Sequence, residues 1–162
     1  MNIALGLAQR RAGAHSSTIG LAGTSVISPA LFDKFESPRA AAFCRALKAE
    51  GCYPFVHACG DETLLLKSLI ATGADALELD PGTDPHACKQ ATRGRTAVLG
   101  MLDPAHILRQ GSRAEVRAHT CEILGSMSPA GGFILGPGCA LPPDTEEDNI
   151  HEIVDCVRQW SP

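Results

Sequence analysis

The chain has 162 residues, of which 44% are hydrophobic and 20% are charged, and its formal net charge is −4. This length and composition suit a single globular domain over residues 1–162. The slight acidic excess argues against the basic surface that nucleic-acid-binding proteins use, and no apolar run is long enough to span a membrane. The seven cysteines lack the pattern of a disulfide framework, and no secretory signal opens the chain, so we expect a reduced, cytoplasmic protein.

Five short segments have the composition of buried strands. Each is almost entirely apolar, without the alternation of a strand that has one face in solvent, and this is typical of strands in a parallel sheet. The segments cover residues 17–21, 53–58, 76–79, 96–101 and 132–135.

Helical patterns lie between these segments. Asp84 followed by Pro85 marks the start of one helix, and Ser112 with Glu115 three residues later has the spacing of a capping box. Helices are predicted over residues 32–50, 62–72, 84–93, 112–127 and from residue 144 onward. The last helix carries an apolar stripe that we expect to be buried, formed by Ile150, Ile153, Val154 and Val157.

The alternation of strand and helix predicts an α/β fold with parallel strands and right-handed crossovers. An open doubly wound sheet and a (β/α) barrel both fit it, but no Gly-x-Gly-x-x-Gly follows any strand. The notable polar residues instead follow strand ends, where barrel enzymes place their active sites. We therefore predict an incomplete parallel (β/α) barrel of the TIM type, with about five of eight βα units. The polar residues at strand ends are His57, Cys59, Asp80, Asp103 and Cys139.

His57, Cys59 and Cys139 form the candidate site, with one imidazole and two thiols each near a strand end. These are ligands that suit zinc, and three protein ligands leave a coordination position open for a substrate. Taken singly, each has a plainer interpretation as a hydrogen-bonded histidine or an inert thiol. Cys52 is no rival ligand, because it lies about 20 Å from Cys59 at the other end of the same strand.

The remaining candidates are expected to have structural roles. Asp80 and Glu78 are placed to orient His57, but we expect such acids to cap the next helix or to lie at the mouth of the barrel. Asp103, which precedes Pro104, is expected to cap a turn. Free thiols are predicted at Cys44, Cys52, Cys88, Cys121 and Cys156, and solvated imidazoles at His15, His86, His106, His119 and His151.

Four motifs occur along the chain in this order: Ile27-Ser28-Pro29, His57-Ala58-Cys59-Gly60, Gly100-Met101-Leu102-Asp103-Pro104, and Gly136-Pro137-Gly138-Cys139 followed by Pro142, Thr145 and Asn149. In this order and spacing they resemble the C-terminal portion of the uroporphyrinogen decarboxylase superfamily, specifically its corrinoid-dependent methyltransferase branch. The second motif is similar to the His-x-Cys-Gly metal motif of that branch, and the fourth is similar to its Gly-Cys loop. The resemblance covers residues 12–160.

The resemblance implies a zinc ion held by His57, Cys59 and Cys139. In that branch the zinc binds a small thiol substrate as thiolate, which attacks the methyl group of a methylated corrinoid carried by a partner protein. A free thiol, with a pKa of about 8.5, is mostly protonated at neutral pH, and coordination to zinc removes its proton. Two thiolate ligands keep the bound sulfur nucleophilic, so they favour thiolate transfer over water activation.

Two alternatives stay open. The first is a uroporphyrinogen decarboxylase-type enzyme, although Pro137 falls near the position where the decarboxylase branch has the histidine of Gly-His-Gly. Met101 and Leu21-Ala22 also replace the Asn and Asp-Pro that are usual in the family. The second is a non-catalytic half-barrel or a corrinoid-binding subunit. Because a complete barrel takes about 250 residues, we expect a barrel-completing chain or a homo-oligomer, and no activity from this fragment alone.

Overall fold

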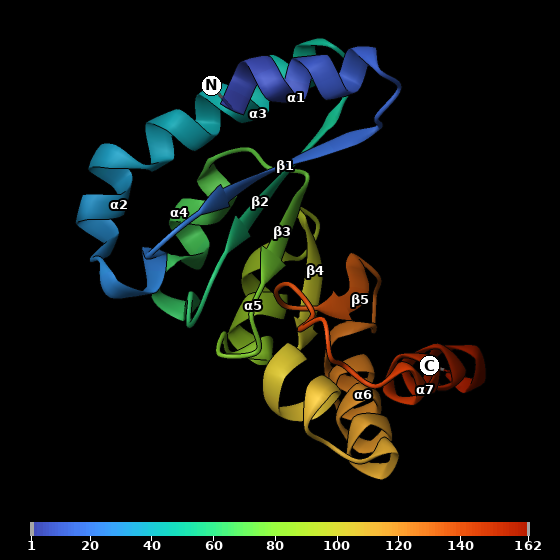
Figure 1. Ribbon diagram of the computed structural model, residues 1–162. Helices are drawn as coiled ribbons and strands as arrows, with labels where there is room; N and C mark the ends of the chain where they lie inside the picture. Colours follow the sequence, from blue (N-terminus) through green and yellow to red (C-terminus); the bar gives the residue numbers. More distant parts are fainter. Residues whose placement is uncertain (1, 162) are drawn as a thin grey trace.

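The computed structural model describes residues 2–161 and shows one parallel sheet of five strands (Figure 1). The strands lie in the sheet in the order in which they occur in the sequence. The predicted α/β fold is therefore confirmed, and each strand end lies within two residues of its prediction. The strands are β1 Ser16–Leu21, β2 Tyr53–Ala58, β3 Ala76–Leu79, β4 Ala97–Leu102 and β5 Phe133–Pro137.

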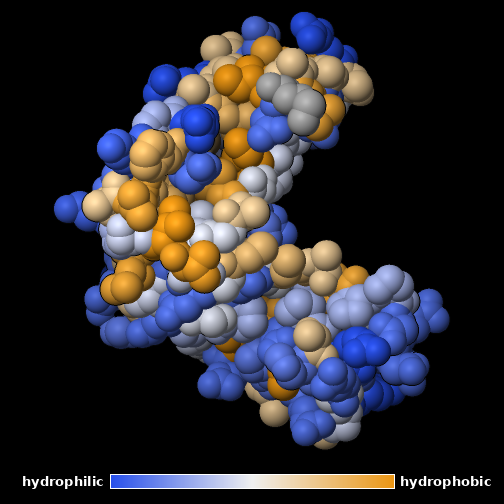
Figure 2. Space-filling view, turned by 60° about the vertical axis from the view of Figure 1, so that its left-hand side comes forward, coloured by the Kyte–Doolittle hydropathy of each residue, from blue (hydrophilic) through white to orange (hydrophobic). Residues whose placement is uncertain are grey.

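The sheet is an arc of a barrel rather than a closed one. Within residues 2–161, β1 pairs only with β2, and β5 pairs only with β4. Both edges of the sheet are therefore unpaired, as expected for about five of the eight units of a TIM barrel. In Figure 2 the molecule is a crescent, hollowed on one side between its two ends.

Helices cover the convex face of the arc (Figure 1). None of those in residues 2–161 is long and apolar enough to cross a membrane. The α-helices are α1 Asn2–Arg11, α2 Pro29–Phe35, α3 Ser37–Ala49, α4 Leu66–Ala71, α5 Pro85–Thr92, α6 Arg113–Met127 and α7 Glu147–Gln159. Shorter turns follow three of the strands, namely the 3-10 turns η1 Thr24–Val26 and η2 Thr63–Leu65 and the π-helical segment η3 Pro104–Arg109.

Local capping signals mark where α5 and α6 begin. Asp84 caps α5, and Ser112 with Glu115 forms the complete capping box of α6, so both predictions are confirmed. The helix predicted over residues 32–50 is instead two helices, because α2 already begins after Ser28 and ends at Phe35. Pro38 lies in the first turn of α3, where its missing N–H is tolerated; in the interior of one long helix it would remove a hydrogen bond.

The two faces of the sheet carry different side chains, because successive residues of a strand point to opposite sides. The convex face is apolar and buried beneath the helices, with Ile19, Val56, Leu77 and Val98 at its centre. The concave face is partly open to solvent. There the strand register aligns one row across the sheet, formed by Gly20, His57, Glu78, Leu99 and Ile134.

Helix α7 packs differently from the prediction. Its buried face includes Glu152, which accepts a hydrogen bond from Arg113 at 2.8 Å and lies 2.6 Å from a guanidinium nitrogen of Arg117. These ion pairs tie α7 to α6. The predicted burial of the apolar stripe is wrong for Val154 and Val157, which are 43% and 46% exposed. No element in residues 2–161 covers that side of α7.

Candidate metal centre

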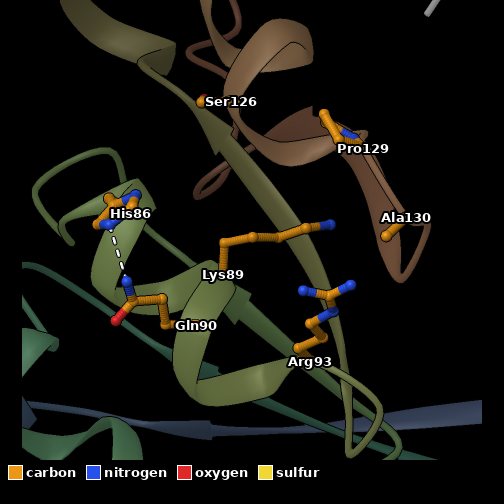
Figure 3. Close-up of a pocket in the computed structure, with 7 residues that line it drawn as sticks. All are labelled: His86, Lys89, Gln90, Arg93, Ser126, Pro129 and Ala130. Atoms are coloured by element: carbon orange, nitrogen blue, oxygen red, sulfur yellow. Dashed lines mark hydrogen bonds between the residues drawn. The ribbon is translucent and has the colours of Figure 1, made fainter.

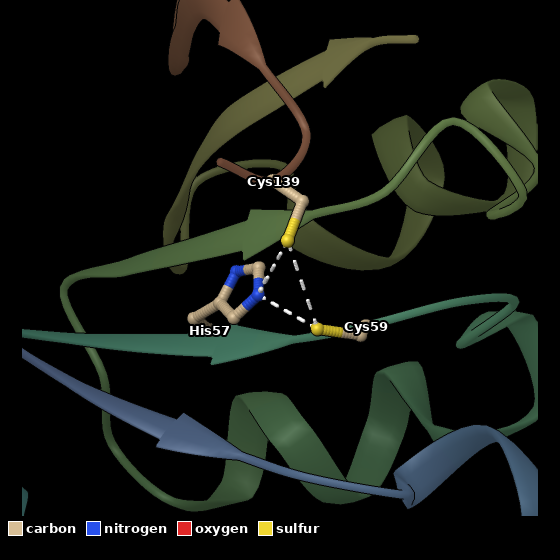
Figure 4. A group of neighbouring side chains, drawn as sticks. All are labelled: His57, Cys59 and Cys139. Carbon is tan, nitrogen blue, oxygen red and sulfur yellow. Dashed lines mark hydrogen bonds between the residues drawn. The ribbon is translucent and has the colours of Figure 1, made fainter. Parts of the chain in front are cut away.

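His57, Cys59 and Cys139 converge at the carboxyl end of the sheet (Figure 4). His57 comes from β2, Cys59 follows that strand directly, and Cys139 lies in the loop after β5. The Nε2 atom of His57 is 2.9 Å from Cys59 Sγ and 3.6 Å from Cys139 Sγ, and the two sulfur atoms are 4.0 Å apart. Among residues 2–161 these form the one group of three or more His, Cys, Asp or Glu side chains close enough to share a metal ion.

Two glycines allow the loop after β5 to reach across the sheet toward β2. A Cβ atom on Gly138 would lie 2.7 Å from the Cα atom of Asp80. Gly100 has a φ of 109°, and a Cβ atom there would lie 3.1 Å from the Cα atom of Gly138 in the loop. The loop therefore packs directly against the backbone at the ends of β3 and β4, and this brings Cys139 to a residue three strands away.

The separations can be compared with those in a tetrahedral zinc site. Zn–S bonds of about 2.3 Å and Zn–N bonds of about 2.0–2.1 Å place two sulfur atoms about 3.8 Å apart and a nitrogen and a sulfur about 3.6 Å apart. The two separations that involve Cys139 agree with these values. The separation between His57 and Cys59 would have to widen by about 0.7 Å. With this small adjustment the donor set fits zinc and leaves one coordination position for a substrate.

The second ring nitrogen of His57 faces Glu78. This Nδ1 atom is buried without a hydrogen-bond partner in residues 2–161, and Oε2 of Glu78 is 3.6 Å from it. Metal-bound histidines usually donate this N–H to a carboxylate or carbonyl, which fixes the tautomer and the ring orientation. Glu78 is therefore in position to orient His57, although a purely structural role is expected from its sequence position.

Asp80 holds the loop that carries Cys59. Its Oδ2 atom accepts a hydrogen bond from the amide of Gly60 at 2.8 Å. Asp80 lies at the carboxyl edge of the sheet, one of its two predicted placements, and it does not cap α5, which begins after Asp84. It therefore joins the end of β3 to the end of β2 beside the candidate ligands.

Glu62 is a buried acid that the sequence does not single out. Its Oε1 atom accepts a hydrogen bond from Thr24 Oγ1 at 2.5 Å, whereas Oε2 has no partner in residues 2–161. Burial raises the pKa of Glu62 more than the hydrogen bond from Thr24 lowers it. In the sequence this position marks the start of a predicted helix, where a glutamate is ordinarily solvated, so no local signal identifies it.

The thiol of Cys59 is protonated in the absence of a cation. Burial, followed by the nearby Cys139, Asp80 and Glu62, raises the pKa of Cys59 to about 11. A metal ion must therefore displace this proton when it binds, because the thiolate is the ligand. The acidic neighbours among these causes, Asp80 and Glu62, also favour a cation between the two sulfur atoms.

The other candidates lie away from this cluster. Asp103 caps η3 by accepting hydrogen bonds from the amides of Ala105 and His106, both at 2.9 Å, which confirms its predicted role in a turn. The solvated state predicted for His119 is wrong, because its side chain is half-buried and its Nε2 atom is enclosed without a partner in residues 2–161. Free thiols are confirmed at Cys44, Cys52, Cys88, Cys121 and Cys156.

The sheet is an arc of a parallel (β/α) barrel, and the candidate ligands lie at the ends of its strands. The fold is therefore of the TIM-barrel class, in which sites lie at the carboxyl edge of the sheet. The family model described as uroporphyrinogen decarboxylase (URO-D) matches residues 1–160. The chain belongs to this family, which confirms the resemblance seen in its motifs.

Relatives with two different activities are equally similar to the chain. It is 28% identical over 94% of its length to uroporphyrinogen decarboxylase of Thermus thermophilus, and 28% identical over 98% of its length to methylcobamide:CoM methyltransferase MtbA of Methanosarcina mazei. The matches cover 43% and 46% of these relatives, so the chain spans less than half of their length. Identity alone does not choose between the two activities.

A solved structure supports the fold. A methyltransferase from Methanosarcina mazei matches with a TM-score of 0.86 at 22% identity, over 98% of this chain and 46% of that one. The five-stranded arc therefore has the fold of less than half of that structure.

Proposed function

We propose that this chain is the metal-binding part of a zinc-dependent methyltransferase, which transfers a methyl group from a methylated corrinoid to a small thiol. The observation that carries the proposal is the convergence of one imidazole nitrogen with two thiol sulfurs, from His57, Cys59 and Cys139. The match to a relative named methylcobamide:CoM methyltransferase supports it.

The donor set determines the chemistry that the site favours. A zinc ion held there would supply the charge that keeps a bound thiol substrate deprotonated. Cys59 and Cys139 contribute two negative charges, so the substrate sulfur stays more nucleophilic than at a histidine-rich site. Glu78 would accept the Nδ1 proton of His57 in a hydrogen bond and so keep Nε2 directed toward the two sulfur atoms.

Apolar side chains near this edge support delivery of the corrinoid by a partner protein. A Cβ atom on Gly60, the residue after Cys59, would lie 2.7 Å from Ser25 Oγ, so η1 lies against the loop that carries a candidate ligand. The next residue in η1, Val26, is 84% exposed, and Leu64 in η2 is 83% exposed. Large exposed apolar side chains that gather beside a site are typical of surfaces that bind a partner.

The open edges support completion of the barrel by a second chain or by another copy. Strands β1 and β5 present unpaired backbone groups, and Tyr53 and Ile134 near them are 61% and 47% exposed. We therefore expect residues 1–162 in isolation to self-associate. Size-exclusion chromatography checks this, and a monomer with a cooperative melting transition would contradict it.

Metal analysis of the purified protein tests the proposed site. We expect about one zinc ion per chain, lost in Cys139→Ser and retained in Cys121→Ser, which removes a half-buried thiol outside the cluster. Zinc-loaded protein, combined with a chain that completes the barrel, is then assayed for demethylation of methylcobalamin in the presence of coenzyme M or homocysteine. Folded protein that binds no zinc would overturn the proposal. Protein that binds zinc and a corrinoid but transfers no methyl group would instead be a non-catalytic subunit.

The equal similarity to uroporphyrinogen decarboxylases defines a second candidate, a metal-independent decarboxylase of a tetrapyrrole. Pro137, which falls near the position of that branch's histidine, speaks against it, as does the thiol of Cys139 beside it. Release of carbon dioxide from uroporphyrinogen by zinc-free protein would favour this candidate over methyl transfer.

A further inference from the structure

A second hollow lies on the outer side of the molecule, between α5 and the turn after α6 (Figure 3). This groove has a volume of about 580 Å³ and shares no lining residue with the hollow beside His57 and Cys139. One wall is a single face of α5, continued by Arg93 directly after the helix, because the lining residues recur at spacings of three and four. These residues are His86, Lys89, Gln90 and Arg93.

The opposite wall is a turn whose shape depends on Lys89. The ammonium group of Lys89 donates hydrogen bonds to the carbonyl oxygens of Met127 at 2.5 Å and Gly131 at 2.6 Å. The carbonyls at this end of α6, which would repel an anion, are thereby partly neutralised. Ala130 in the turn has a φ of 65°, a left-handed conformation that is unfavourable for a residue with a side chain. Strained backbone that is held by specific contacts is characteristic of ligand-binding segments.

Arg93 supplies a free cationic group to the groove. It forms no hydrogen bond or ion pair within the described part of the chain, whereas Arg109, Arg113 and Arg117 are each paired with a carboxylate. No acidic side chain lines the groove, although the chain as a whole has a net charge of −4. A second cavity of about 160 Å³ adjoins at Arg93 and extends the space beside its guanidinium group. A free guanidinium group binds phosphate oxygens through two parallel hydrogen bonds.

We propose that this groove binds a small organic phosphate of the size of a nucleoside monophosphate. Arg93 lies two helical turns from His86, about 10 Å along α5, so the ligand needs an anionic end and a separate hydrogen-bonding end. The ring nitrogen Nε2 of His86 and the amide of Gln90, 2.8 Å apart, form the polar edge at that second end. Across the groove from Lys89 and Arg93, Pro129 and Ala130 present apolar surface to a ring (Figure 3). The volume is within the usual range for small-molecule sites.

Isothermal titration calorimetry with adenosine monophosphate tests this site on the full chain. We expect saturable binding with one ligand per chain and a dissociation constant below about 1 mM. Arg93→Gln should weaken binding at least about tenfold, because hydrogen bonds to a charged group are lost. Arg95→Gln is the matched control, since Arg95 is also exposed but lines neither cavity. This variant should bind the nucleotide as tightly as the wild type. Inorganic phosphate should bind more weakly than the nucleotide.

Three results would overturn the proposal: no saturable heat at about 10 mM nucleotide, equal affinity of the wild type and Arg93→Gln, or adenosine binding as tightly as its monophosphate. Zinc content is measured on the same samples. Because the groove shares no residue with the metal centre, both arginine variants should keep the zinc content of the wild type. Loss of nucleotide binding and failure of the proposed zinc site are therefore separate outcomes.

Discussion

The convex and concave faces of the sheet differ in how completely they are covered. The convex face is enclosed by helices, and Leu77 and Val98 on that face and Phe43 of α3 are at most 1% exposed. The concave face carries His57 and leaves Ile134 47% exposed. The candidate ligands nevertheless converge, because backbone contacts between strand ends position them. The arrangement of the three candidate ligands therefore does not depend on a closed barrel, whereas enclosure of the concave face does.

Removing one aromatic ring from each side of the sheet should give the largest difference in stability. Phe43→Ala should lower the free energy of unfolding by about 3–5 kcal/mol, because a buried ring leaves a cavity in the core. Tyr53→Ala, at a side chain that is 61% exposed, should cost less than about 1 kcal/mol. Urea denaturation followed by circular dichroism measures both. A loss at Tyr53 as large as that at Phe43 would show that the concave face is covered in solution.

The glycines of the β5 loop test whether backbone packing positions the ligands. Gly138→Ala should lower zinc affinity by about 10–100-fold, comparable to the loss of a group that orients a ligand, because the added Cβ pushes the loop away from Asp80. Gly136→Ala is the matched control, since a Cβ there meets nothing within 4 Å. Competition with a chromophoric chelator measures the affinities. Equal affinities in the two variants would contradict this account of the loop.

The raised pKa of Cys59 predicts how metal binding depends on pH. Since that pKa is about 11, the free thiol is protonated at neutral pH and zinc binding releases its proton. For this thiol alone, apparent zinc affinity should fall about tenfold for each unit of pH below 11 and level off above it. Calorimetry in two buffers with different ionisation enthalpies measures the protons released. Zinc binding that releases no proton would show that Cys59 is not a ligand.

Local patterns in the sequence predicted much of the fold and named the candidate ligands. Apolar runs identified the strands, and caps such as Asp84 identified helix starts, because both act over a few residues. Burial of Glu62 and exposure of Val154 were not predictable, since they depend on which distant segments cover them. The close approach of Gly138 to Asp80 likewise joins residues far apart in the sequence. Orientation of His57 by Glu78 was one of two alternatives that the sequence left open, and strand register places the two residues side by side.

The smallest expected effect is on zinc affinity, at a residue that is proposed to orient a candidate ligand but not to bind the metal itself. Glu78→Gln should lower zinc affinity by about tenfold, because a neutral amide holds the Nδ1 proton of His57 less strongly than a carboxylate does. Glu122→Gln provides a matched control, since Glu122 lies 4.0 Å from Nδ1 of His119 in a similar pair on α6. The zinc content at saturation should stay at about one per chain in both variants. Complete loss of zinc in folded Glu78→Gln would contradict a role limited to orienting His57 through its Nδ1 atom.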